Sequence, residues 1–360
     1  MMQVYNFNAG PAALPKPVML KAQEEFVNYH GTGIGIIEES HRAKPFDEVI
    51  QAAEANVRKL LNVPEEYAVL FLQGGASLQF AMAPMNLMVP GKKVGVANTG
   101  VWAKKAMKEI KIQGGEVDLI FDGEANGYTA IEGVKEWKVD QDLAYMHICS
   151  NNTIYGTEYF DYPETGNVPL VADMSSDIMS HRLDVTKFGM IFAGAQKNIG
   201  PAGLTLVILR KDLAERAAAN VPTMLKYTTH IEGKSLFNTP PTFAIYILRL
   251  VTDWMLENGG LEAMEKVDIA KAELLYDYID NSGFYRGTAA KASRSRMNVT
   301  FRLPTEDQEK AFVAFAKEQG LLGLKGHRAV GGCRASIYNA VPLEGVQRLI
   351  EVMEAFKKQA

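Results

Sequence analysis

A single lysine, Lys197, lies between two apolar runs in the stretch FAGAQKNIGPAGLTLVIL, residues 192–209, where its neighbours are small or amide residues. A second chemically capable group, Asp173, follows the preceding apolar run, PLVA. Desolvation of a lysine at such a position lowers its pKa, so that the free amine can act as a nucleophile and as a base. Each group alone has an ordinary explanation, because a lysine beside a strand is usually solvated and an aspartate there often caps a helix.

Together, the two groups match what one cofactor requires. Pyridoxal phosphate binds a lysine through a Schiff base at its aldehyde, and it needs a carboxylate that keeps the pyridine nitrogen protonated. The protonated ring then withdraws electrons from a carbanion at the α-carbon of the substrate. Lys197 and Asp173 therefore predict a pyridoxal phosphate site, provided that the strands before them bring them together.

Seven short apolar segments between about residues 66 and 210 predict those strands. The segments are YAVLFLQGG, KKVGVANTG, GEVDLIF, LAYMHICSNN, PLVADMSS, FGMIFAG and LTLVILR. They are apolar throughout, which is typical of strands buried on both faces, so we expect a mostly parallel sheet covered by helices, in the α/β class. In such open sheets ligands bind at the carboxyl ends of the strands, where Lys197 and Asp173 both lie.

The chain of 360 residues is long enough for two domains, and its pattern changes after about residue 260. Residues 16–260 are predicted to form the large domain. Residues 261–360 contain a long amphipathic helix, the strand RMNVTFRL, two more helices and a Gly-rich loop, which predict a smaller α+β domain. We assign the N-terminal segment, residues 1–15, to this small domain.

Composition and charge favour a small-molecule ligand. The formal net charge of -4 provides no positive field for nucleic acid or an anionic membrane. The two cysteines, Cys149 and Cys333, cannot build a disulfide framework or a four-ligand zinc site, so we expect no metal. The first residues, MMQVYNFNAGPAALP, lack the basic and apolar regions typical of a signal peptide, and no apolar run approaches the roughly 20 residues of a membrane span. We therefore expect a cytoplasmic protein.

A phosphate cradle for the cofactor is predicted in the stretch QGGASLQFAM. The backbone N–H groups of Ala76 and Ser77, at a helix start, would face the phosphate. Trp102, just after another strand, would stack on the pyridine ring. Asn238 and Thr239, followed by two prolines, are predicted to cap a second helix that supplies further donors. Each signal alone is weak, because a Gly-Gly turn can simply cap a helix and a tryptophan can simply pack in the core.

Two basic clusters are candidates for binding an anionic substrate. His41 and Arg42 follow GTGIGIIEES, and His327, Arg328 and Arg334 lie in the Gly-rich loop of the small domain. Arginine binds carboxylate and phosphate through two parallel hydrogen bonds, so several arginines in one cleft would suit a small di- or trianion. Surface arginines are common, however, and each could instead be solvated. GTGIGII is not a dinucleotide fingerprint, because it follows a helical stretch and not a strand.

These motifs together resemble one known family over essentially the whole chain. The motifs are NFNAGPAALP, SHR at 40–42, the GGAS cradle, AQKNIGPAG, FNTPPTFAIY and GHRAVGGCRASIYNA. They are similar to those of the phosphoserine aminotransferases, pyridoxal phosphate enzymes of the class V aminotransferase family with the aspartate aminotransferase fold (fold type I). The resemblance implies that fold here, with the residues named above at one active site.

For the cofactor, the resemblance implies a role at each matching position. Lys197 would form the Schiff base, Asp173 would pair with the pyridine nitrogen, and Trp102 would stack on the ring. Thr153 would hydrogen-bond the 3-hydroxyl group of the cofactor. The residues that would hold the cofactor phosphate are Ala76, Ser77 and Gln196, joined by Asn238 and Thr239 of the neighbouring subunit. The active unit would then be a homodimer.

For the substrate, the resemblance implies that Arg334 clamps the α-carboxylate. The phosphate of phosphoserine, or the distal carboxylate of glutamate, would be surrounded by His41, Arg42, His327 and Arg328. One departure from the family lies in the cradle, where other members often have a third glycine, a cysteine or an arginine at the positions of Ala76 and Ser77. Since the contact is made by backbone N–H groups, we expect the cofactor still to bind.

The implied reaction is a reversible, ping-pong transamination. O-phospho-L-serine and 2-oxoglutarate would give 3-phosphohydroxypyruvate and L-glutamate, a reaction that runs in reverse in L-serine biosynthesis. Lys197, released from the cofactor by the substrate, would move the α-proton as a base and then as an acid. Use of 4-phosphohydroxy-L-threonine, in pyridoxine and pyridoxal phosphate synthesis, is a further possibility that the sequence leaves open.

Three alternatives remain at this stage. A cysteine desulfurase on the same fold needs a mobile nucleophilic cysteine, for which Cys333 is the loop candidate. A serine-pyruvate type aminotransferase would share the cofactor residues but use another substrate. A catalytically inactive scaffold of this fold is the third, but such a protein has no need for Lys197, Asp173 and the anion-binding clusters together.

Overall fold

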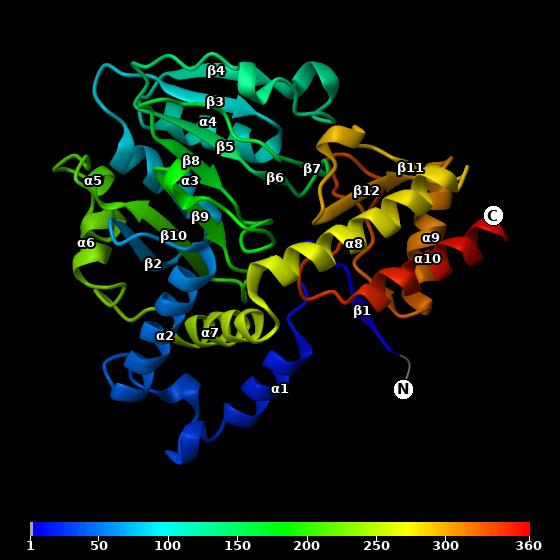
Figure 1. Cartoon of the computed structure of the whole chain (residues 1–360), viewed down its shortest axis with the longest axis horizontal. Helices are drawn as coiled ribbons and strands as arrows, with labels where there is room; N and C mark the ends of the chain where they lie inside the picture. Colours follow the sequence, from blue (N-terminus) through cyan, green and yellow to red (C-terminus); the bar gives the residue numbers. More distant parts are fainter. Residues whose placement is uncertain (1–2) are drawn as a thin grey trace.

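The computed structural model describes residues 3–360, and a seven-stranded sheet forms its centre (Figure 1). The strands lie in the order β2-β10-β9-β8-β5-β3-β4. Their bounds are β2 (Tyr67–Gln73), β3 (Val94–Asn98), β4 (Val117–Asp122), β5 (Tyr145–Cys149), β8 (Leu170–Asp173), β9 (Met190–Gly194) and β10 (Leu204–Arg210). Only β10 runs antiparallel to its neighbours, β2 and β9. The seven predicted strands and the mostly parallel sheet are therefore confirmed.

Helices cover both faces of this sheet. Side chains of alternate residues along β2 enter two different cores, with Val69 and Phe71 in one and Leu70 and Leu72 in the other. Helices α2 (Lys44–Leu61) and α7 (Thr242–Glu257) pack on the first face, and α3 (Gly75–Leu87) and α4 (Val101–Ile112) pack on the second. The prediction of burial on both faces is wrong for the edge strand β4, which is partly exposed. The remaining helices of this part are α1 (Lys16–Glu25), α5 (Lys211–Ala214) and α6 (Tyr227–Glu232).

A smaller unit follows in the chain, and α8 (Gly260–Asn281) leads into it from the unit that contains the sheet (Figure 1). The unit contains its own apolar core, to which Phe7, Phe301 and Phe312 belong. It comprises β11 (Arg286–Gly287), β12 (Asn298–Arg302), α9 (Glu306–Glu318), β13 (Leu321–Leu322), β14 (Cys333–Ser336) and α10 (Leu343–Lys357). β1 (Tyr5–Asn6) pairs with β13, so the N-terminal segment contacts this unit. The exact domain bounds, 16–260 and 261–360 with 1–15, remain a prediction.

One predicted helix start is wrong. Asn238 and Thr239 do not cap α7, because the residue before its first turn is Pro241 and no side chain caps that end. A proline at this position has no N–H to satisfy, so the helix can begin later than the capping pattern suggested.

A short hairpin, β6 (Asn151–Asn152) with β7 (Thr157–Glu158), follows β5. None of the helices within residues 3–360 is long and apolar enough to cross a membrane.

Candidate active site

Lys197 lies in the connection between β9 and β10, next to the carboxyl end of β8. Its Nζ atom donates a hydrogen bond to Oγ1 of Thr153, at 2.5 Å. Burial lowers the pKa of Lys197, and the negative charge of Asp173 only partly opposes this shift. A larger fraction of Lys197 than of an ordinary lysine is therefore the free amine, which is the nucleophilic and basic form.

Asp173 ends β8, beside β9, and its carboxylate is buried. Its Oδ1 atom accepts hydrogen bonds from the backbone N–H of Ser175, at 3.0 Å, and from Ser175 Oγ, at 2.5 Å. Burial raises the pKa of Asp173, whereas the charge of Lys197 and the hydrogen bonds from Ser175 lower it. Turns and not a helix follow this strand, so the alternative of a helix cap is wrong. The sequence prediction missed Ser175, although the polar pair Ser175-Ser176 directly after an apolar run was a signal for it.

The predicted cradle lies at the start of α3. Gly74 precedes the helix with a positive φ of 93°, and a Cβ there would come within 2.5 Å of Leu78, so the turn requires glycine. Ala76 and Ser77 occupy the first helical turn, where backbone N–H groups have no partner within the helix and attract an anion. The Ala76 N atom lies 3.5 Å from the place where a Cβ on Gly194, at the end of β9, would sit. The cradle therefore lies next to the end of β9, the strand that leads to Lys197.

The ring of Trp102, in the first turn of α4, faces Lys197. The Lys197 Nζ atom lies 5.3 Å from the ring centroid, and the Nζ atom of Lys105 lies 4.5 Å from it. The indole N–H of Trp102 is buried and has no hydrogen-bond partner within residues 3–360. Trp102 also packs partly against the core, as the alternative interpretation expected, and its stacking on the cofactor ring stays a prediction.

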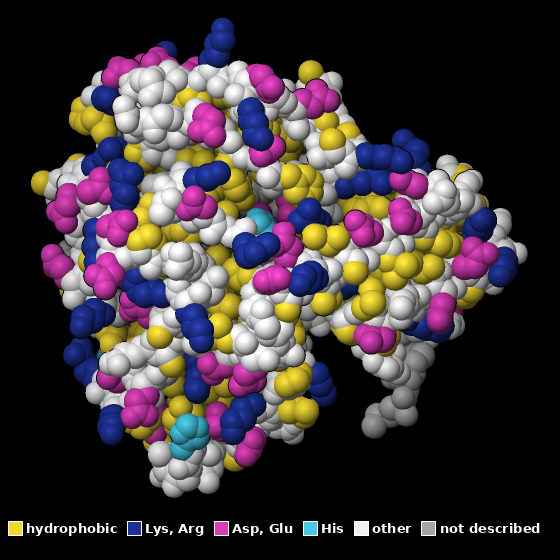
Figure 2. Space-filling view, in the orientation of Figure 1, with side chains coloured by type: hydrophobic (Ala, Val, Ile, Leu, Met, Phe, Trp, Pro, Cys, Tyr) yellow, Lys and Arg dark blue, Asp and Glu magenta, His cyan; other side chains and the backbone are white. Residues whose placement is uncertain are grey.

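A group of cations lies beside Lys197, on the small unit and α4. Arg334, on β14, donates through Nη1 to the backbone oxygen of Thr153, at 2.9 Å, and its buried Nε has no partner in the described chain. Burial lowers the pKa of Arg334, and burial together with the charges of Arg334, Arg328 and Lys105 lowers the pKa of His327. Lys105 was missed, although its spacing three residues after Trp102 on a helix places both on one face. On the face of the molecule drawn in Figure 2, basic and acidic side chains are interspersed over both units.

The structure does not bring every predicted residue together within one chain. His41 and Arg42 follow a short 3-10 helix, Ile36–Glu38, that packs against α7. Among residues 3–360, neither residue makes a hydrogen bond or an ion pair with Lys197 or Arg334. Arg42 is exposed, and the buried Nε2 atom of His41 has no partner in the same part of the chain. A role for these two residues at the Lys197 site therefore stays a prediction.

Gln196 and the pair Asn238-Thr239 make contacts with other segments of the same chain. Gln196 precedes Lys197, and its backbone oxygen accepts a hydrogen bond from the N–H of Ala12, at 2.9 Å. The backbone oxygen of Thr239 accepts from the side chain of Gln73, at the end of β2, at 3.3 Å. Asn238 is adjacent to Thr239 in the chain, so this segment lies close to the end of the cradle strand.

Cys333 does not have the properties of a mobile nucleophile. It lies in β14, opposite Phe301 on β12, and its side chain is buried. Burial raises the pKa of the thiol well above its ordinary value, so the reactive thiolate is disfavoured. This geometry removes the main argument for a cysteine desulfurase.

The comparisons with known proteins agree with one another. The family model for class-V aminotransferases matches residues 4–349 of the chain. The chain is 54% identical over 358 residues to the phosphoserine aminotransferase of Lysinibacillus sphaericus, and 53% identical over 359 residues to that of Alkalihalobacillus alcalophilus, with 99% of each chain covered. A solved phosphoserine aminotransferase, described under the subject of radiation damage of its Schiff base, has a TM-score of 0.98 at 53% identity, with both chains fully covered (100%). The PLP-bound enzyme from Trichomonas vaginalis has a TM-score of 0.91 at 38% identity, covering 98% of this chain and 100% of that one.

Proposed function

The chain belongs to the class-V aminotransferase family, and we propose a role for each side chain through which it transaminates phosphoserine. Its cofactor is pyridoxal phosphate, and its activity is that of a phosphoserine aminotransferase. The single observation that best supports the assignment of roles is the position of Lys197. Its amine has a lowered pKa and donates a hydrogen bond to Thr153. It also lies close to the buried carboxylate of Asp173 and to a cluster of cations.

The donor groups of the site fit pyridoxal phosphate. The N-terminal turn of α3 offers free backbone N–H groups and contains no acidic side chain, which suits a phosphate dianion. Asp173 offers a buried carboxylate, which suits a protonated ring nitrogen. The residues that would hold the phosphate of the cofactor are Ala76, Ser77 and Gln196, with Asp173, Trp102, Thr153 and Lys197 around its ring.

When bound, pyridoxal phosphate supplies the electron sink that stabilises a carbanion at the substrate α-carbon. Lys197 carries out the proton transfer. Its amine takes the α-proton of the substrate as a base and then gives up a proton as an acid. Thr153 orients that amine through the hydrogen bond to Oγ1. Gly10 keeps the N-terminal segment close, since a Cβ at this position would lie 3.4 Å from Lys197 Cγ. This segment and Trp102 shield the amine from water.

Arg334 is proposed to bind the α-carboxylate of the substrate. One arm of its guanidinium group is already fixed by the backbone oxygen of Thr153, and the unpartnered, buried Nε remains for a ligand. A carboxylate can accept two parallel hydrogen bonds from such a fork. Because Thr153 contacts both Arg334 and Lys197, the carboxylate site and the base are joined through one residue.

The distal phosphate is proposed to bind the basic groups beside this fork, namely His327, Arg328 and Lys105. Burial, together with the charges of Arg334, Arg328 and Lys105, lowers the pKa of His327, so a bound dianion would offset those charges and favour the protonated imidazole. The same basic groups would accept the distal carboxylate of glutamate and 2-oxoglutarate. We propose 2-oxoglutarate as the amino acceptor, L-serine biosynthesis as the pathway, and 4-phosphohydroxy-L-threonine as a second substrate that fits the same anion site.

Replacement of Arg328 tests the phosphate site. The Arg328→Ala protein is expected to lose about 10- to 100-fold in kcat/KM for phosphoserine, since a hydrogen bond to a charged group is worth about 1.5–3 kcal/mol. For alanine, which has no distal anion, the loss should be small. Steady-state kinetics with both donors measures this, with the exposed Arg286→Ala as the control for charge. An equal loss for both donors would remove Arg328 from the phosphate site.

A second copy of the chain is proposed to complete the site. Exposed apolar side chains gather on α1 and the segment after it, and a surface of this kind marks a protein interface. These residues are Met19, Leu20, Phe26, Val27, Ile34 and Ile37. In a homodimer, the partner would supply His41 and Arg42 to the substrate and Asn238 and Thr239 to the cofactor phosphate. Phe237, exposed beside that last pair, fits the same contact.

Because both cysteines are free thiols, we also propose a cytoplasmic location.

The substrate assignment is tested by the visible absorbance of the protein with pyridoxal phosphate bound. Addition of O-phospho-L-serine, without any keto acid, should convert the visible band to that of pyridoxamine phosphate. Alanine and aspartate should convert it much less. An equal response to alanine would favour the serine-pyruvate type of aminotransferase, and no visible band after addition of pyridoxal phosphate would contradict the cofactor site.

A further inference from the structure

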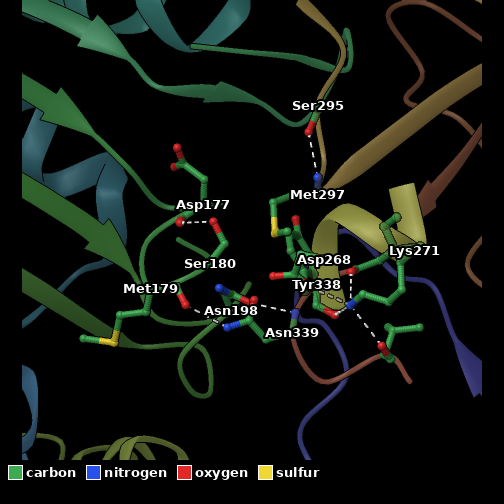
Figure 3. A network of polar contacts seen from close by, with 12 residues as sticks. Asp177, Met179, Ser180, Asn198, Asp268, Lys271, Ser295, Met297, Tyr338 and Asn339 are labelled. Atoms are coloured by element: carbon green, nitrogen blue, oxygen red, sulfur yellow. Dashed lines mark hydrogen bonds and ion pairs between the residues drawn. The ribbon is translucent and has the colours of Figure 1, made fainter. Parts of the chain in front are cut away.

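Two buried asparagines, Asn198 and Asn339, connect three segments of the chain at the back of the site (Figure 3). Asn198 accepts a hydrogen bond through Oδ1 from the backbone N–H of Asn339, at 3.0 Å. Its Nδ2 atom donates to the backbone oxygen of Ile178, at 2.7 Å. The Nδ2 atom of Asn339 donates to the backbone oxygen of Met179, at 2.8 Å. We call Asn198 and Asn339 the asparagine joint.

Each of the three connected segments carries one residue of the proposed site. Residues 178–179 belong to the turns that follow Asp173 at the end of β8. Asn198 is the residue after Lys197. Asn339 follows β14, the strand that carries Arg334. The asparagine joint therefore fixes the carboxylate, the amine and the guanidinium relative to one another, although they come from distant parts of the sequence.

The small unit holds its side of the asparagine joint through a buried lysine. Lys271, on α8, donates hydrogen bonds to the backbone oxygens of Ile337, Tyr338 and Val341, at 2.8, 2.8 and 3.0 Å. Its charge is paired with Asp268, at 2.7 Å, and both side chains are buried. Figure 3 shows that this lysine and Asn198 hold the same segment, residues 337–341, from different elements. The segment after β14 is thus attached to α8 as well as to the Lys197 connection.

We propose that Asn198 is a positioning residue, which sets the distance between Arg334 and Lys197 through the asparagine joint. When Arg334 binds the α-carboxylate, this distance decides whether the α-hydrogen lies within reach of the lysine amine. Misplacement by about 1 Å can cost on the order of 100-fold in rate. The proposal rests on the roles proposed above for Lys197 and Arg334.

The test uses Asn198→Ala, which removes the hydrogen bonds to Ile178 and to the N–H of Asn339. Single-turnover rates, followed by cofactor absorbance, are compared for phosphoserine and for O-phosphoethanolamine, which has the same phosphate but no α-carboxylate. We expect a loss of about 10- to 100-fold for phosphoserine and less than about threefold for O-phosphoethanolamine. Asn339→Ala, which removes only the bond to Met179, should give a smaller loss with the same preference.

Asn86→Ala is the matched control for the loss of a buried asparagine. Asn86 also bonds only to backbone groups, with three hydrogen bonds against two for Asn198: two as donor to Met82 and Leu225 and one as acceptor from Tyr227. It lies at the far end of α3. Thermal unfolding should show a comparable loss of stability for Asn86→Ala and Asn198→Ala. Only Asn198→Ala should discriminate between the two amino donors.

A double-mutant comparison separates positioning from a general effect. In the Arg334→Ala background, the further change Asn198→Ala should reduce the phosphoserine rate by less than about threefold, because the distance it controls no longer matters. Equal losses for both donors, or a full loss in the Arg334→Ala background, would overturn the proposal while leaving the proposed function in place. If Arg334→Ala itself fails to discriminate between the donors, the role of Arg334 is wrong and the proposal falls with it.

Discussion

The Lys197→Ala protein, supplied with pyridoxal phosphate, should transaminate phosphoserine at least about a thousandfold more slowly than the unmodified protein. The change removes both the group that binds the cofactor covalently and the base that moves the α-proton, and acid-base catalysis alone contributes about 10² to 10⁴ in rate. Single-turnover absorbance with phosphoserine measures the loss. Borohydride reduction followed by peptide mass analysis should find a pyridoxyl group on Lys197 in the unmodified protein and on no lysine in the variant.

Lys187→Ala is the control for this experiment, because Lys187 is an exposed lysine at the end of a short 3-10 helix, Val185–Lys187. Its removal should leave the rate and the pyridoxyl label unchanged. The lowered pKa of Lys197 makes a further distinction, since a desolvated amine reacts with aldehydes at a pH where exposed lysines stay protonated. Near-normal turnover by Lys197→Ala would show that the assignment of Lys197 is wrong.

Asp173→Asn should reduce turnover by about 200- to 5000-fold with little change in volume at the site. The change replaces a buried charge by a neutral amide, and loss of one partner of a buried ion pair costs about 3–5 kcal/mol. The ring nitrogen of the cofactor would then lose the charge that favours its protonated form. Single-turnover rates with phosphoserine measure the effect, and equilibrium dialysis shows whether pyridoxal phosphate also dissociates more readily.

Asp184→Asn is a closely matched control for Asp173→Asn. Asp184 also accepts hydrogen bonds through Oδ1 from the backbone N–H and the hydroxyl of the residue two positions later, here Thr186 at 3.0 and 2.6 Å, but it is exposed. Its replacement should disturb the same local turn without changing catalysis. If both variants kept full activity, Asp173 would have only a structural role.

The sequence predicted the sheet well, because strands buried on both faces appear as short, continuous apolar runs. The ends of those runs then directed attention to Lys197 and Asp173. The edge strand β4 and the start of α7 were predicted less well. In both cases the local pattern was plausible, but the packing of the rest of the chain decided the outcome.

The residues that the sequence did not predict act across space. Asn198 and Asn339 are far apart in the chain, and nothing in their local sequence indicates that their backbone and side-chain groups meet. Lys105 gains its importance only because His327 and Arg334 come close to α4 in the folded chain. Sequence motifs reveal which groups can do chemistry, whereas tertiary contacts decide which of their neighbours hold them in place.

The position of β10 in the sheet has a consequence for how the protein is made. β10 is the neighbour of both β2, which leads into the phosphate cradle, and β9, which leads into Lys197, yet it is the last of the seven strands to be synthesised. On the ribosome, β2 has no place in the growing sheet until β10 emerges and joins it to β9. Cofactor capture therefore belongs to a late stage of biogenesis, after the sheet is complete, and truncated nascent chains should not retain pyridoxal phosphate.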